Sequence, residues 1–112
     1  MDEKILNLFN NKFSFEEHEN RLDLGFRNIL KEIRDFTNNL GDNVKEEIRP
    51  HRIVYSKGIV FRIFLDIEPA YDKIIITIKK GREKKERYVI QKLTENIEFI
   101  KKEINDAYIN IQ

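Results

Sequence analysis

The chain contains no cysteine and no tryptophan, and only four glycines and two prolines among its 112 residues. The absence of cysteine excludes disulfides, thiolate metal sites and cysteine nucleophiles. Four scattered glycines are too few to build a glycine-rich phosphate-binding loop. Apolar runs such as Ile74 to Ile76 are far shorter than a membrane span. We therefore expect a chain that does not enter the membrane.

A clear excess of charge of one sign is also lacking. Lysine and arginine number 21, and aspartate and glutamate number 20. Domains that bind DNA through its phosphates usually carry a basic excess, so nucleic-acid binding would here require a local basic patch. The first twelve residues alternate charged and apolar side chains and lack the apolar core of a signal peptide. We expect a soluble, cytoplasmic protein.

The length fits a single domain over residues 1–112 with one hydrophobic core. Residues 1–13 have the spacing of a short amphipathic helix. Ser14 and Glu17 form a capping box at the start of a longer helix. That helix is predicted over about 15–39 and ends at Gly41 as a left-handed cap. Its apolar stripe consists of Leu22, Phe26, Ile29, Ile33, Phe36 and Leu40.

The second half of the chain has the alternation typical of strands. Strands are predicted over 51–55, 59–67, 71–79 and 87–90, whereas the charged segment 42–50 is interpreted as a connection. Thr94 is expected to cap a last helix over about 95–110. The predicted fold is an α+β two-layer sandwich, with about four antiparallel strands and both helices packed on one face of the sheet.

Several segments resemble a small uncharacterised prokaryotic domain. They are the stretch from Phe13 to His18, residues 29–36, the pair of motifs around Ile53-Val54-Tyr55 and Val60-Phe61, and the ending 93–98 with Ala107-Tyr108. That domain occurs alone, or at the C-terminus of predicted transport proteins and of nuclease- or restriction-associated proteins. The family often has a segment with glycine and tryptophan before its last helix. This chain instead has a lysine- and arginine-rich hairpin over 81–91.

Two histidines are candidate catalytic or metal-binding residues. His18 follows Glu16 and Glu17 but lacks a second ligand at helical spacing, so we interpret it as part of the helix entry. His51 stands between Arg49 and Arg52 and has no carboxylate nearby to orient it as a general base. We interpret it as a polar strand start, with a weak phosphate-facing cluster as the alternative.

The pattern Asp72 followed by Glu83-x-Lys85 invites comparison with nuclease sites that hold Mg²⁺. Glu83 and Lys85 fall at a predicted hairpin tip, where ligands would not be preorganised. We therefore predict no metal, no cofactor and no catalytic residues.

Two features predict a binding surface. The first is the sheet face opposite the helices, where Phe64 should point away from the core near Tyr55 or Tyr71, with Arg62 on the same face. The second is a basic hairpin, which either follows a phosphate backbone or is a solvated guard of an edge strand. Its residues are Lys79, Lys80, Arg82, Lys84, Lys85 and Arg87.

The leading hypothesis is a non-enzymatic binding or protein-interaction module, with a homodimer through the long helix or a free edge strand as one form. The alternative is a nucleic-acid-associated domain of a DNA-processing or defence system. A hydrolase with an unrecognised site is the further alternative.

Overall fold

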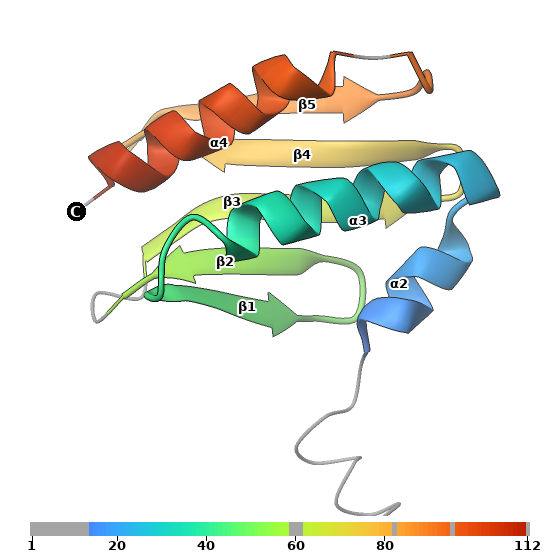
Figure 1. Cartoon of the computed structure of the whole chain (residues 1–112), viewed down its shortest axis with the longest axis horizontal. Helices are drawn as coiled ribbons and strands as arrows, with labels where there is room; N and C mark the ends of the chain where they lie inside the picture. The colour runs from blue at the N-terminus through green and yellow to red at the C-terminus, as the bar shows by residue number, and fades with distance from the viewer. Residues whose placement is uncertain (1–13, 59–61, 82, 95, 112) are drawn as a thin grey trace, which may run out of the picture.

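A five-stranded antiparallel sheet carries helices on one of its faces (Figure 1). The computed structural model describes residues 14–58, 62–81, 83–94 and 96–111, so the predicted helix over 1–13 lies outside the described residues. The strands follow the chain in spatial order, as a meander. The elements are α2 (Phe15–Arg21), α3 (Leu24–Asn38), β1 (Val44–Ile48), β2 (Ile53–Lys57), β3 (Arg62–Ala70), β4 (Lys73–Lys79), β5 (Lys85–Ile90) and α4 (Ile97–Asn110).

The α+β class and the antiparallel sheet are confirmed, and α3 and α4 lie side by side on the same face (Figure 1). We call this face of the sheet the inner face and the opposite one the outer face. Inner-face side chains and the two helices form one core, and the apolar stripe of α3 is buried in it. That stripe is therefore not free to pair with a second copy of the helix. None of the described helices is long and apolar enough to cross a membrane.

The predicted long N-terminal helix is wrong, because the structure has two helices, α2 and α3, in its place. Leu22 is extended, and the side chain of Asp23 accepts a hydrogen bond from the backbone N–H of Leu24 at 2.9 Å. Aspartate is a favoured N-cap, so it starts a new helix where periodicity alone predicts continuation. The capping box is supported at its first bond, since the N–H of Glu17 donates to Ser14 Oγ at 3.3 Å.

The sheet has one strand more than predicted, because β1 falls in the segment interpreted as a connection. In β1 the residues Val44, Glu46 and Ile48 are half-buried and alternate with exposed ones. Glu46 lies opposite Tyr55 in the register and so faces inward. A glutamate at an inward position breaks the apolar alternation by which a strand is recognised.

A β-bulge changes which face Phe64 occupies. Tyr55 pairs with Leu65 and Ser56 pairs with Ile63, so Phe64 is the extra residue on β3. Its side chain is fully buried, with its ring 5.5 Å from that of Tyr108 on α4. The prediction that Phe64 points away from the core is wrong, because simple alternation cannot anticipate a bulge.

The remaining boundaries shift by a few residues. Strand β4 begins after a turn at Tyr71 and Asp72, β5 begins at Lys85, and α4 is capped by Asn96, whose side chain accepts from the N–H of Phe99. Gly41 is not a left-handed cap, since positive φ among the described glycines occurs at Gly58 and Gly81. A Cβ at Gly41 would meet the hydroxyl of Tyr108, so a larger residue there requires the Tyr108 side chain to shift.

Candidate functional site

The outer face of the sheet is the candidate site, because no described helix covers it (Figure 1). Strand register assigns its residues, since directly opposed side chains share a face. One row joins Val54, Asp66, Thr77 and Arg87 across four strands, a second joins Glu68, Ile75 and Val89, and a third pairs Lys79 with Lys85.

Two ion pairs lie on the half of this face built by β1, β2 and β3. Arg49 pairs with Glu47 at 3.0 Å, and Arg52 pairs with Asp66 at 3.0 Å. Val54, which lies between Glu47 and Asp66 in the register, is only 2% exposed. The two arginines beside this half are therefore already paired, and the carboxylate of Glu68 on the same half disfavours an anionic partner.

The half built by β4 and β5 differs in kind, and we call it the cationic ribbon face. It consists of Lys73, Ile75, Thr77, Lys79, Lys85, Arg87 and Val89, with four cations and no carboxylate. Lys79 and Lys85 are direct cross-strand partners. Like charges placed directly opposite each other destabilise a sheet, so an anion bound beside this pair would reduce the repulsion between the two ammonium groups. None of the four cations has an ion pair with a described residue.

The inner side of the same two strands is neutralised. The ammonium group of Lys80 pairs with Glu103 of α4, and with Glu86 at 3.4 Å. The hydrogen bond with Glu103 raises the pKa of Lys80 above its ordinary value. Lys84 and Asp106 both line a hollow between the hairpin and α4. The basic hairpin predicted as one patch is thus divided between two faces, and Arg82 lies outside the described residues.

The three residues predicted for an aromatic outer surface do not form one. Tyr55 and Phe64 are both fully buried and offer no side-chain surface to a partner. Arg62 is exposed at the start of β3, opposite Lys57. The ammonium group of Lys57 donates to the carbonyl of Tyr108 at 2.7 Å, and so binds the C-terminal turn of α4.

Sequence reasoning missed a polar cluster around Glu46, which accepts hydrogen bonds from three side chains. Arg34 donates through Nε at 2.9 Å and Nη2 at 2.8 Å, the hydroxyl of Tyr55 donates at 2.7 Å, and Asn38 donates at 3.2 Å. Burial acts to raise the pKa of Glu46, but these hydrogen bonds outweigh it and the pKa is lowered. Burial, together with the adjacent carboxylate, raises the pKa of Tyr55. All the partners are protein groups, so the cluster fastens β1 to α3.

His18 has a structural role that its neighbours in the sequence do not indicate. It is 1% exposed, and its Nε2 lies 2.7 Å from the carbonyl oxygen of Arg49, to which it donates. Its Nδ1 has no hydrogen-bond partner among the residues the structure describes. Burial lowers the pKa of His18, so the ring is held neutral. His51 is exposed at the β1–β2 turn and does not converge with a carboxylate into a described cluster.

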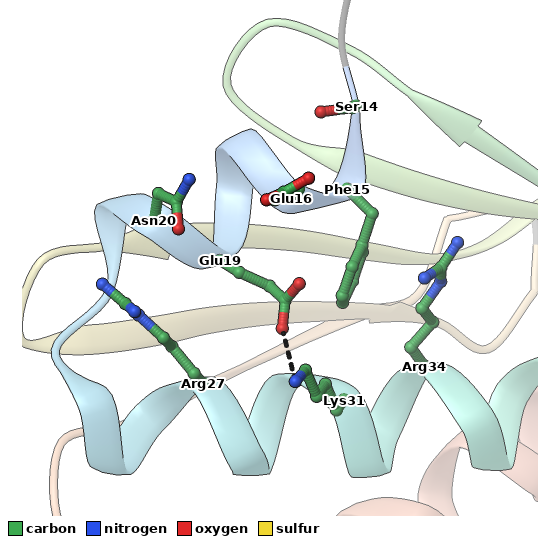
Figure 2. A pocket seen from close by; sticks show the side chains of 8 residues that line it. All are labelled: Ser14, Phe15, Glu16, Glu19, Asn20, Arg27, Lys31 and Arg34. Atoms are coloured by element: carbon green, nitrogen blue, oxygen red, sulfur yellow. Dashed lines mark ion pairs between the residues drawn. The ribbon is translucent and has the colours of Figure 1, made fainter.

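A hollow between α2 and α3, of about 480 Å³, gathers three cations, but each already has a partner (Figure 2). Lys31 pairs with Glu19 at 3.3 Å, and the Nε of Arg27 donates to the carbonyl of Leu22 at 2.9 Å. Arg34 stacks over the ring of Phe15 at 3.9 Å while bound to Glu46. The hollow is a seam that joins the two helices.

The nuclease-like pattern is not assembled. Asp72 lies at the β3–β4 turn, whereas Glu83 and Lys85 lie at the other end of β4. Seven residues of strand separate them, which is roughly 20 Å. Within the described ranges, no three histidine, aspartate or glutamate side chains gather to hold a metal ion.

Comparison of the chain with family models, curated proteins and solved structures found no match. The resemblance to a small uncharacterised prokaryotic domain therefore stays a prediction, and the site is argued from its own geometry.

Proposed function

We propose that the chain is a non-enzymatic binding module that holds a macromolecular partner against the cationic ribbon face. The observation that carries this proposal is the contrast within one sheet. Arg49, Arg52 and Lys80 have carboxylate partners elsewhere on the sheet. The four cations of the cationic ribbon face have no ion pair among the described residues.

The state of the buried titratable groups supports binding over catalysis. Catalytic groups with shifted pKa values need access to a substrate. His18 is buried against a backbone carbonyl, and Glu46 is saturated by Arg34, Tyr55 and Asn38. These perturbed groups are explained by structural contacts.

A protein partner or a second copy could also bind at a sheet edge, where β1 and β5 each have one side that pairs with no other described strand. Strand β5 joins this edge to the cationic ribbon face, so one surface serves both modes. A nucleic-acid partner is the second candidate, and the opposed Lys79 and Lys85 favour it.

An NMR titration tests the proposal. The ¹⁵N-labelled chain is mixed separately with a DNA duplex, with a polyglutamate peptide and with the unlabelled chain. Binding by any of them should shift the amides of Ile75, Thr77 and Val89, while those of α3 and α4 stay unchanged. Shifts confined to the helices, or no shift with all three probes, would contradict the proposal.

A further inference from the structure

The choice of partner depends on the chemistry of the cationic ribbon face. Protein interfaces are enriched in aromatic residues and depleted in lysine, particularly at their centres. Both aromatic residues expected on the outer face, Tyr55 and Phe64, are in the core. Of the seven residues on the cationic ribbon face, three are lysines, one is arginine and none is aromatic. This composition fits phosphate contacts better than a protein hot spot.

The same composition discriminates between forms of nucleic acid. Proteins that bind single strands without sequence preference stack the bases on aromatic side chains. The cationic ribbon face offers no such platform. A duplex presents its phosphates outward at high charge density and needs no stacking.

We propose that the cationic ribbon face binds the phosphate backbone of a nucleic-acid duplex through Lys79, Lys85 and Arg87. This inference rests on the proposed function and names the partner. The pairing of Lys79 with Lys85 places two ammonium groups side by side, and Arg87 follows two residues along β5, roughly 7 Å away. An anionic strand crossing there relieves the repulsion between the two lysines. Recognition does not depend on base sequence, because Thr77 is the one uncharged polar side chain on this face.

The thermodynamic consequence is a defined dependence on salt. Each neutralised phosphate contributes about −0.9 to the slope of log affinity against log salt concentration. Three contacts give a slope of about −3, which weakens binding roughly 40-fold between 50 and 200 mM salt. Removal of two cations should leave a slope of about −1, with only a three- to four-fold loss over the same range.

Fluorescence anisotropy of the full chain with a labelled 20-base-pair DNA duplex measures these slopes. The test variant is Lys79→Gln/Lys85→Gln. The matched control, Lys31→Gln/Lys102→Gln, removes the same charge from the exposed surface of α3 and α4. The control should keep the wild-type slope, whereas the test variant should lose about two units of it. Exchanging the duplex sequence should leave the affinity unchanged within about two-fold.

Other outcomes overturn the inference. A wild-type slope near zero, or the same slope in the test variant and the wild type, excludes the backbone contact. Binding to polyglutamate at the same face without binding to the duplex also overturns it, but leaves the proposed function intact. The melting temperature of the test variant should equal or exceed that of the wild type, because a repulsive pair is removed, so loss of binding cannot be attributed to unfolding.

Discussion

Phe64 is the residue whose replacement best tests the bulge in β3. Its side chain has 0% exposure and its ring meets that of Tyr108 at 69°, in an edge-to-face arrangement. Phe64→Ala should lower the free energy of unfolding by about 3–5 kcal/mol, through lost transfer energy and the cavity left behind. If Phe64 lay on the outer face, as alternation predicts, the same substitution would lower the free energy of unfolding by about 0.5 kcal/mol or less.

Urea denaturation followed by far-UV circular dichroism measures this difference. Val89→Ala is the matched control, because Val89 is 38% exposed on the outer face and its truncation should cost less than about 1 kcal/mol. The total free energy of unfolding of a domain of this size is about 5–15 kcal/mol, so Phe64→Ala can unfold the protein. Phe64→Leu is therefore the second variant, with an expected loss of about 1–2 kcal/mol.

A double-mutant cycle with Tyr108→Leu extends the test. The ring pair should contribute a coupling of about 0.5–1.5 kcal/mol. If Phe64→Ala costs no more than Val89→Ala and the coupling is zero, Phe64 faces solvent and the assignment of the outer face is wrong.

Three further predictions concern single contacts. Glu46→Gln should lower the free energy of unfolding by about 1–3 kcal/mol at pH 7, because the carboxylate partner of Arg34 loses its charge. Since hydrogen bonds hold the pKa of Glu46 below 4.5 in the fold, the wild type should lose this stabilisation as the pH falls below that value. Urea titrations at several pH values should show that the variant lacks this pH-dependent loss. Because burial lowers the pKa of His18 below 6.5, the unfolded chain takes up this proton first, so wild-type stability should decline as the pH falls below about 6.5, and thermal melts of His18→Gln should show a flatter decline. Gly25→Ala should stabilise α3 by up to about 1 kcal/mol, because the three atoms nearest to the new methyl group all belong to the side chain of Leu93, which is 59% exposed and can move. A lower melting temperature would show that Leu93 is fixed.

The sequence predicts elements well where polarity and spacing agree. The isoleucines of β4 at positions 74, 76 and 78 are all fully buried, as period-two alternation requires. It fails where a polar side chain takes an inward position or the backbone adds a residue. Glu46 faces inward because Arg34 approaches from α3, and that partner lies twelve residues away in the chain. Long-range compensation of this kind has no local signature.

The sequence predicts only part of the candidate site, because the division of its lysines between two faces also depends on contacts that are distant in the chain. Composition correctly identifies a lysine-rich hairpin, but it cannot tell which lysines share a face or which have carboxylate partners. Lys79 and Lys80 are neighbours in sequence and yet lie on opposite sides of the sheet. Only the register between β4 and β5 brings Lys79 beside Lys85.

The near-zero net charge of the chain conceals this asymmetry. A partner responds to the field of the face it meets, and charges farther away than a Debye length of about 8 Å are screened at physiological salt. Glu86 and Glu103 lie on the inner side, where both carboxylates pair with Lys80. Glu83 lies in the turn between the two strands, at the border of the cationic ribbon face. Asp66 lies in the same cross-strand row as Arg87, but its carboxylate pairs with Arg52. Glu68, opposite Ile75, borders the face on the β3 side. Most acidic residues therefore balance the total charge away from the cationic ribbon face, which itself contains no carboxylate, and the overall charge is a poor argument against an anionic partner there.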